Sequence, residues 1–396
     1  MSKKPEFDVT VIGAGVVGLS IAHFLSKTKL SVLAIDSEDN FGKVTSSRNS
    51  EVIHSGIFNP QDSLKYQLCQ RGNELIYKFC DENKIWYKNC GKIVVSKEQE
   101  IDNFNSFTES LIKKGIEFDI LTSEQSSKME QNIISDKSIY IESSGVIDSH
   151  DYMNHLFRIA SDYCTFIFES NAIEIKKRKD VYELQIQRKN KEIETINTSS
   201  IINCAGLNSY TIAKKIMNQN LKIPSLKFYK GSYFALSSKW RNRFDRLVYS
   251  LPQPDDSLGI HISFDSTGRT KIGPDYEEVE AKNFDYTVNE NSQKKFFDSA
   301  KDYIKDLQFD DLTPDYSGVR PKLFFTNDNF SEFYINEENK NGFPNLINLI
   351  GIDSPGLTAS LAIGELVVQT MIPKMNLWVV KNLNKLCLHN PIMNRL

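Results

Sequence analysis

The sequence predicts an α/β (α+β) protein, in which a parallel-sheet domain built from separated segments is interleaved with a mixed-sheet domain. Three observations lead to this class. An apolar strand near the start runs directly into three closely spaced glycines and a helix, as in parallel nucleotide-binding units. Short apolar strands followed by small residues return twice later in the chain. Between them, apolar and polar residues alternate as in antiparallel strands.

The composition limits the possible classes of protein. The chain has 396 residues, 40% hydrophobic and 25% charged, which suits two domains and a sizeable core. Its net charge of -3 argues against nucleic acid as the main partner, because a phosphate backbone requires a clustered positive surface. The six cysteines show no Cys-x-x-Cys spacing, so no metal site or dithiol motif is predicted.

The first strand begins within a few residues of Met1, which leaves no room for a signal peptide and favours a cytoplasmic location. No apolar run approaches the ~20 residues that a membrane helix needs. Residues 357–372 are the longest apolar-leaning region, and Gly364, Glu365 and Gln369 interrupt it, so a buried helix is predicted there. Peripheral membrane contact at the inner face stays open.

The opening unit covers residues 7–36, and its first part is Phe-Asp-Val-Thr-Val-Ile-Gly-Ala-Gly-Val-Val-Gly. Gly13 permits a tight turn, Gly15 lets the backbone approach a pyrophosphate, and Gly18 lets the helix pack on the strand. The helix N-terminus offers free N–H groups and partial positive charge to phosphates. A second strand ends at Asp36, which can accept hydrogen bonds from ribose hydroxyls. The unit therefore predicts a Rossmann-like dinucleotide site, but it does not indicate which dinucleotide binds.

The later segments of the same domain are predicted from periodicity and small residues. They are a helix over 148–163, a strand over 165–168, a solvated antiparallel meander over 173–195, a strand over 200–204, a helix over 210–217, a strand over 345–350 and a turn plus helix over 354–370. The remaining segments indicate a mixed sheet with flanking helices. They are strands over 92–95, 230–236, 258–263 and 271–273, and helices over 98–114 and 292–307.

Four segments could carry chemistry. In residues 45–56, hydroxyls, an amide and an arginine gather where a second phosphate or a flavin ring would lie. His54 could orient a flavin or take a substrate proton, although a structural histidine in a polar loop is the alternative. Residues 203–206 end a strand in small side chains, which would allow close approach of a cofactor or simply form a turn.

The third segment is Gly-Val-Arg-Pro at 318–321, where Arg320 could clamp a carboxylate through its planar guanidinium or form a surface ion pair. The fourth covers residues 350–358, a strand, a small-residue turn and a helix start. Free N–H groups there can hold an anionic ring oxygen, and Ser354 or Thr358 could cap the helix.

These segments, in this order, resemble flavoproteins of the D-amino-acid oxidase and glycine oxidase superfamily, and most of all its L-2-hydroxyglutarate dehydrogenase/oxidase family. The resemblance covers nearly the whole chain. It rests on residues 48–57 (Arg-Asn-Ser-Glu-Val-Ile-His-Ser-Gly-Ile), 63–65, 68–69, 72, 230–234, 258–262, 268–269, 272–274, 318–320 and 354–365. Two departures from the family pattern weaken the prediction of a five-carbon diacid substrate more than the prediction of the flavin site. The family usually has glycine in place of Glu51, and its tail often reads Ala-Pro-Ser-Pro-Ala-Ala-Thr instead of residues 352–358.

The resemblance implies FAD, bound without a covalent link. The residues implied for it are Gly13, Gly15, Gly18, Asp36, Ser47, Arg48, Ala205, Gly206, Ser354, Pro355, Gly356, Leu357 and Thr358. It also implies domain segments 1–85, 146–218 and 318–396 for FAD and 86–145 and 219–317 for the substrate. The predicted substrate is a small 2-hydroxy acid, with L-2-hydroxyglutarate first, and the electron acceptor is oxygen or a quinone.

For the chemistry we expect His54 as the base, with His261 as the alternative, and Arg320 as the partner of the C1 carboxylate. Lys230 could meet a distal carboxylate or lie at a strand edge. Other substrates stay open, namely an amino acid that is deaminated or glycerol 3-phosphate, as does a non-catalytic flavin module. An NAD dehydrogenase is disfavoured because it has no use for a second cofactor-facing turn near the C-terminus.

Overall fold

The computed structural model describes residues 4–252, 259, 261–281, 284–325 and 330–375. Its first sheet has six strands in the order β20-β21-β13-β1-β2-β9. Their bounds are β1 (Val9–Ile12), β2 (Val32–Ile35), β9 (Cys164–Ile167), β13 (Ile201–Asn203), β20 (Tyr334–Glu337) and β21 (Leu346–Ile350). All pairs are parallel except that of β20 with β21. The strands are short and apolar because a parallel sheet is covered on both faces.

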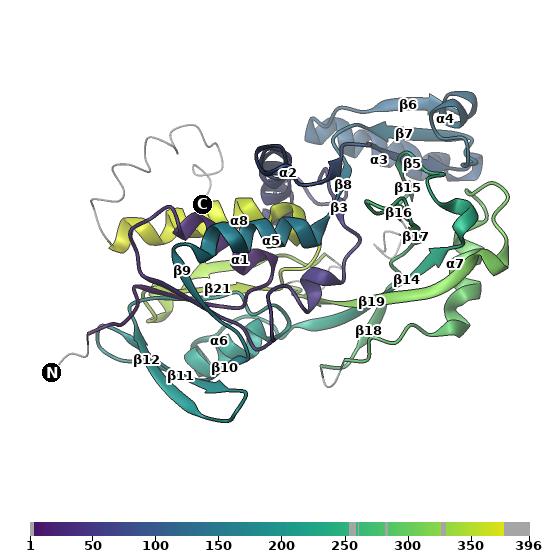
Figure 1. Cartoon of the computed structure of the whole chain (residues 1–396). Coiled ribbons are helices and arrows are strands. Elements are labelled where there is room, and N and C mark those ends of the chain that lie inside the picture. Colours follow the sequence, from purple (N-terminus) through teal and green to yellow (C-terminus); the bar gives the residue numbers. More distant parts are fainter. Residues whose placement is uncertain (1–3, 253–258, 260, 282–283, 326–329, 376–396) are drawn as a thin grey trace.

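Helices cover one face of this sheet and a smaller sheet covers the other (Figure 1). The first group comprises α1 (Val16–Leu25), α2 (Leu64–Asn83), α5 (Ser149–Ser161) and α8 (Gly356–Met375). On the other face lie α6 (Ser209–Met217) and the antiparallel strands β10 (Ser170–Lys177), β11 (Tyr182–Arg188) and β12 (Ile193–Thr198). Alternation along β2 explains both cores: Val32 and Ala34 pack with α1 and α8, whereas Leu33 and Ile35 pack with the smaller sheet.

A nine-stranded mixed sheet forms the second half of the molecule, in the order β18-β14-β17-β16-β15-β5-β7-β6 with β19 on β14. The strands are β5 (Lys92–Ser96), β6 (Asp119–Thr122), β7 (Lys137–Ile141), β14 (Lys227–Leu236), β15 (Leu247–Ser250), β16 (Ile262–Phe264), β17 (Thr270–Ile272), β18 (Glu277–Val279) and β19 (Leu312–Lys322). Flanking helices are α3 (Ile101–Lys114), α4 (Ser123–Met129) and α7 (Gln293–Ala300). A small sheet of β3 (Val52–Ile53), β4 (Tyr87–Lys88) and β8 (Gly145–Ile147) lies between the halves (Figure 1).

The predicted α/β architecture is confirmed, but the helices α2 and α4 and the strands β6, β7, β15, β18, β19 and β20 were not predicted, and some element ends differ. The helix expected over 292–307 ends at Ala300. Beyond it, the carbonyl of Tyr303 accepts from the N–H of Ile134 at 3.0 Å and Ile304 bridges to Ile133, so tertiary pairing replaces the last helical turns. Part of the strand expected over 258–263 lies outside the described residues. The predicted domain limit at 318 falls within β19, and the domain limits stay a prediction.

Five of the cysteines lie in the described part of the chain, where all are buried and unbridged; Cys387 lies outside it. The apolar region over 357–372 lies within α8, whose described side chains are mostly buried, as expected. Within the described ranges, no helix is both long enough and apolar enough to span a membrane.

Candidate active site

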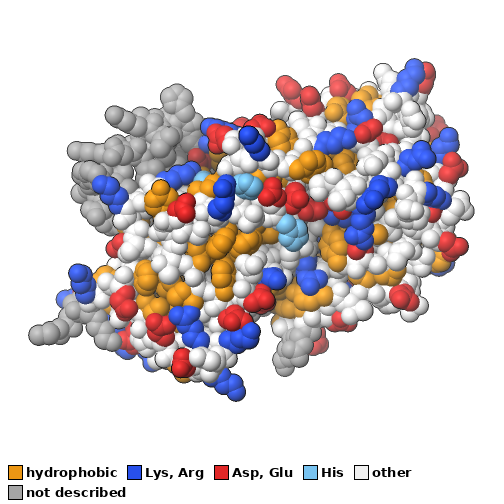
Figure 2. All heavy atoms as spheres, in the orientation of Figure 1, with side chains coloured by type: hydrophobic (Ala, Val, Ile, Leu, Met, Phe, Trp, Pro, Cys, Tyr) orange, Lys and Arg blue, Asp and Glu red, His pale blue; other side chains and the backbone are white. Residues whose placement is uncertain are grey.

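One large cavity of about 1930 Å³ is lined by residues of the glycine loop, the C-terminal turn and the mixed sheet. Most cofactor and ligand pockets occupy ~300–1,000 Å³, so this space is large enough for a dinucleotide and a small substrate together. Figure 2 shows one face of the molecule, on which hydrophobic side chains form a central band and charges of both signs surround it.

The glycine loop has the conformation that the sequence predicts. Gly13 has φ +108°, and a Cβ there would stand 2.5 Å from the carbonyl oxygen of Cys204. Gly13 and Gly15 line the cavity. A Cβ on Gly18 would lie 1.9 Å from the Gly13 oxygen, so Gly18 serves helix-on-strand packing and not ligand contact.

Asp36 lines the same end of the cavity, after β2. Its Oδ2 accepts from the N–H of Ala14 at 2.6 Å and its Oδ1 from Glu38 at 2.9 Å. Burial raises the pKa of Asp36, and these backbone donors oppose the shift. The carboxylate is thus fixed beside the glycine loop, where an adenosine ribose would bind.

In the next loop, the serine that lines the cavity is not the one expected from the sequence. Ser46, in the short 3₁₀ helix η1 (Thr45–Ser47), accepts from the N–H of Val16 at 3.0 Å and lines the cavity. Ser47 instead donates to the carbonyl of Val44 at 3.2 Å and is not among the lining residues. Arg48 lines the cavity, with its guanidinium 4.4 Å from the Tyr286 ring centroid. The serine spacing was ambiguous in sequence, and only the turn decides between the two hydroxyls.

The two later cofactor segments also reach the cavity. Ala205 and Gly206 line it after β13, and residues 354–357, the turn and the first residues of α8, line it as well. Asp353, just before the turn, is buried and bonded to Lys65 at 2.5 Å, with Lys322 3.8 Å from its other oxygen. This buried ion pair fixes the turn from α2, and no pattern in the sequence indicated it.

Thr358 has a different role from the one expected. It is fully buried, and its Oγ1 accepts from the N–H of His54 at 3.0 Å and donates to the carbonyl of Val52 at 3.3 Å. The His54 carbonyl accepts from Asn73 Nδ2 at 2.9 Å. Thr358 therefore supports the histidine loop and does not line the cavity.

His54 lies at the cavity with its Nε2 3.4 Å from Ser354 Oγ. Burial lowers the pKa of His54 to about 3, and the positive charge of Lys92 adds to the shift. The imidazole is therefore neutral near pH 7, the form that can accept a proton. His261 also lines the cavity, and its ring stacks on Tyr249 with centroids 3.7 Å apart.

Of the two expected cations, only one lines the cavity. Arg320, on β19, lines it and donates from Nη2 to the Asp275 carbonyl at 3.2 Å. A Cβ on Gly231 would stand 2.1 Å from Arg320 Nη2, so this glycine makes room for the guanidinium. Lys230 is buried and donates to the carbonyl of Thr287 at 2.6 Å, away from the lining residues. Its position does not support a substrate contact.

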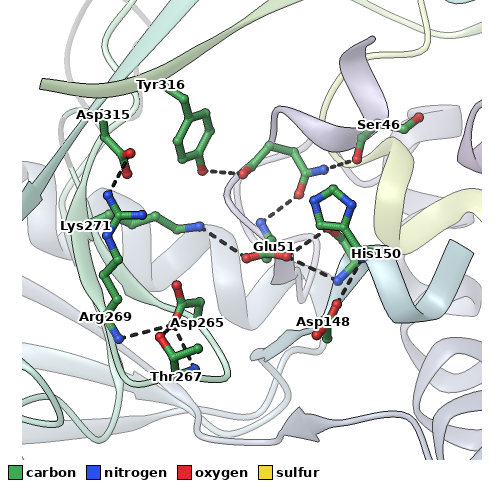
Figure 3. Close-up of polar contacts among 12 residues, drawn as sticks. Ser46, Glu51, Asp148, His150, Asp265, Thr267, Arg269, Lys271, Asp315 and Tyr316 are labelled. Atoms are coloured by element: carbon green, nitrogen blue, oxygen red, sulfur yellow. Dashed lines mark hydrogen bonds and ion pairs between the residues drawn. The ribbon is translucent and has the colours of Figure 1, made fainter. Parts of the chain in front are cut away.

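Glu51, where the resembling family usually has glycine, closes a polar network beside the site (Figure 3). Its φ of +59° is the left-handed conformation that glycine adopts without cost. The carboxylate accepts from Ser149 Oγ at 2.9 Å and pairs with Lys271 at 3.3 Å. Tyr316 donates to the Asn49 carbonyl at 2.6 Å in the same network. These bonds fasten the 46–54 loop to strands of the mixed sheet.

The fold and the glycine loop together define a protein of the dinucleotide-binding α/β class, in which polar groups of the mixed sheet line the same cavity as the glycine loop. A family model described as FAD dependent oxidoreductase (DAO) matches residues 8–370. The chain belongs to this family of FAD-dependent oxidoreductases, so FAD is its cofactor. The prediction of an FAD-dependent oxidoreductase is confirmed.

Several named enzymes are similar to this chain over most of its length. L-2-hydroxyglutarate dehydrogenase from Arabidopsis thaliana is 34% identical over 400 residues, which cover 91% of this chain and 83% of that protein. The Bos taurus enzyme of the same name is 26% identical, covering 94% and 90%. A glycerol 3-phosphate dehydrogenase from Caloramator mitchellensis is 30% identical, covering 92% and 74%. The resemblance to L-2-hydroxyglutarate dehydrogenases is thus confirmed.

Solved structures share the fold. An FAD-bound L-alpha-glycerophosphate oxidase from Mycoplasma pneumoniae superposes with a TM-score of 0.80 at 22% identity, covering 92% of this chain and 94% of that one. A glycine oxidase from Geobacillus kaustophilus gives 0.77 at 18% identity, covering 94% and 96%. The residues present suit FAD, because the cavity joins the glycine loop, Ala205 and the turn at 354–357 in one space.

Proposed function

We propose that the protein oxidises L-2-hydroxyglutarate to 2-oxoglutarate. The observation that carries this proposal is that a neutral histidine, His54, and an arginine, Arg320, line one cavity together with the predicted cofactor segments. The names of several relatives support the same substrate. A 2-hydroxy acid presents a hydroxyl proton and an adjacent carboxylate, which match these two groups.

The residues divide the work of the reaction. FAD supplies a hydride acceptor when it is bound. Arg320 holds the C1 carboxylate through parallel N–H bonds and so fixes the C2 carbon in place. His54 accepts the hydroxyl proton at Nε2, the nitrogen that faces Ser354. Thr358 and Asn73 hold the backbone on either side of His54, which keeps the ring in position.

The test is anaerobic reduction of the purified holoenzyme. L-2-hydroxyglutarate is expected to bleach the visible flavin bands within one turnover, whereas D-2-hydroxyglutarate and L-glutamate leave them unchanged. The product is then identified as 2-oxoglutarate after reoxidation. Persistence of the oxidised spectrum with L-2-hydroxyglutarate would exclude this substrate.

Glycerol 3-phosphate is the second candidate, because one relative of 30% identity carries that name. The same anaerobic experiment separates the two, since glycerol 3-phosphate yields a phosphorylated ketone and no 2-oxo acid. We favour the hydroxy acid because Arg320 offers the planar, bidentate geometry of a carboxylate site. The electron acceptor, oxygen or a quinone, is decided by supplying each separately to the reduced enzyme.

A further inference from the structure

Lys92 is the one buried lysine in the described part of the chain whose charge has no bonded partner. Four lysines there are buried, and three are engaged: Lys65 with Asp353, Lys230 with the Thr287 carbonyl, and Lys271 with Glu51. Lys92 is 0% exposed, and its Nζ has no hydrogen-bond partner among the described residues. An isolated buried ammonium is costly, so the fold would gain from an anion at this position.

The side chain of Lys92 lines the same cavity as His54 and Arg320. Its Nζ lies 4.0 Å from the ring centroid of Tyr249 and 5.3 Å from that of Phe58. Ring faces attract a cation but do not neutralise it. The charge is therefore partly stabilised and still open to a carboxylate that enters the cavity.

Titratable groups around Lys92 leave its charge uncompensated. Burial lowers the pKa of Lys92 to about 7, and the thiols of Cys69 and Cys90 only partly oppose the shift. Both thiols have pKa values of about 11 or 12, so they are neutral near pH 7. His54 is neutral as well, and the pKa of Tyr249, on which His261 stacks, is raised by burial. None of these groups brings a negative charge.

We propose that Lys92 binds the distal carboxylate of a 2-hydroxy dicarboxylic acid and thereby selects diacids over monocarboxylic 2-hydroxy acids. This inference rests on the proposed function. Lys92 on β5 and Arg320 on β19 belong to different strands of the mixed sheet, and both line the same cavity. Lys92 takes the role expected of Lys230.

A substrate pair isolates the distal charge. L-2-hydroxyvalerate has the five-carbon chain of L-2-hydroxyglutarate with a methyl group in place of the distal carboxylate. In the holoenzyme, Lys92→Met is expected to lower kcat/KM for the diacid at least ~50-fold, mainly through KM, because a buried charge loses its partner. The same variant should change kcat/KM for L-2-hydroxyvalerate less than ~3-fold, because the monoacid never pairs with Lys92.

Two variants serve as comparisons. Lys92→Arg keeps the charge and should restore part of the diacid preference. Lys114 also lines the cavity, but its Nζ already donates to the Ile57 carbonyl at 2.7 Å, so Lys114→Met should keep the preference. Equal losses on both substrates in Lys92→Met, or a preference that disappears in Lys114→Met, would overturn the role of Lys92.

Wild-type protein gives an independent measurement if the Lys92 variants fail to fold. Binding of glutarate is followed calorimetrically at about pH 8 in two buffers of different ionisation enthalpy. A carboxylate beside Lys92 raises its pKa, so net proton uptake is expected. Glutarate binding without proton uptake contradicts the proposal.

Failure of the proposed function would look different. If the wild-type flavin is bleached by another substrate and not by L-2-hydroxyglutarate, the assigned reaction is wrong. Glutarate titration of wild type and Lys92→Met then decides on Lys92 alone. Glutarate binding that is lost in the variant retains Lys92 as a carboxylate site, and no binding to wild type removes it.

Discussion

His54 is held by residues far from it in sequence, and its chemistry depends on them. Thr358 and Asn73 fix its backbone, and burial, with a further contribution from the charge of Lys92, lowers the pKa of its ring. A low pKa keeps the imidazole neutral but makes it a weak base in the empty cavity. A substrate carboxylate would offset the charge of Lys92 and raise the pKa of His54. In the proposed reaction, His54 would thus be a stronger base with substrate bound.

His54→Gln is expected to reduce the rate constant of flavin reduction by ~10²–10⁴-fold, because the amide cannot accept the hydroxyl proton. The measurement is anaerobic stopped-flow at saturating L-2-hydroxyglutarate, with FAD content checked by absorbance. His150→Gln, at an exposed position of α5, is the matched control. Near-full reduction rates in His54→Gln would leave His261 as the candidate base.

Arg320→Lys should raise KM for L-2-hydroxyglutarate by about 10–100-fold, because an ammonium cannot form the paired N–H bonds of a guanidinium. Steady-state kinetics measure KM and kcat separately. Arg269→Lys provides the control, since Arg269 pairs with Asp315 and is half exposed. An unchanged KM in Arg320→Lys contradicts the carboxylate role.

At the scale of elements, close contacts between helices set the position of the 46–54 loop, which carries His54. A Cβ on Gly72 of α2 would lie 2.2 Å from the carbonyl oxygen of Thr358 in α8. A Cβ on Gly364 of α8 would lie 2.8 Å from the Ser20 oxygen in α1. These glycines bring three helices together. Since Thr358 holds His54, the spacing of α2 and α8 is transmitted directly to the site.

Gly72→Ala is expected to destabilise the protein by ~1–3 kcal/mol, because the new methyl group meets backbone atoms that cannot turn aside. Thermal unfolding of the holoenzyme measures the loss, and flavin reduction should slow as Thr358 moves. Lys78→Ala, on the exposed face of α2, should stay within ~0.5 kcal/mol of wild type. A Gly72→Ala protein as stable as wild type would show that α2 and α8 can separate without cost.

At the scale of the whole molecule, the two sheets contribute different parts of one site. The parallel sheet and its helices supply the FAD segments, and the mixed sheet supplies Lys92, His261 and Arg320. Glu51 and Lys271 connect the two sides, so the loop that carries His54 follows the mixed sheet (Figure 3). The site therefore requires both halves to fold, and its buried charges reduce the stability of the whole chain.

Lys92→Met should make the substrate-free holoenzyme more stable than wild type, most of all below pH 7. The folded-state pKa of Lys92 is lowered to about 7 from 10.5, so the unfolded chain binds more protons between these values. Wild-type stability consequently rises with pH across this window, and the advantage of the variant shrinks toward pH 10.5.

Denaturant unfolding across this pH range measures that difference. Lys114→Met is the control for loss of a lysine at the cavity. A variant that is less stable than wild type at low pH would mean that Lys92 has a partner in the folded protein.

The sequence by itself determined the family and the cofactor. Gly13, Gly15 and Asp36 could be predicted because their roles depend on local backbone geometry within one strand-turn-helix unit. His54 and Arg320 could be selected because polar residues stood out in apolar segments. Most strands of the parallel sheet could be predicted for a similar reason, since burial imposes a regular apolar pattern, whereas several strands of the mixed sheet, β19 among them, were not predicted.

Only the tertiary structure decided which polar groups share the cavity. Ser46 lines the cavity, and Ser47 does not. The Thr358 hydroxyl accepts from the backbone of His54, and Lys230 donates to the Thr287 carbonyl. Lys92 was indistinguishable in sequence from any lysine at a strand start. The role of Lys92 depends on the groups around its ammonium, and those groups come from strands and loops far apart in the chain. Pairing of charges is a long-range property, whereas a glycine turn is a local one.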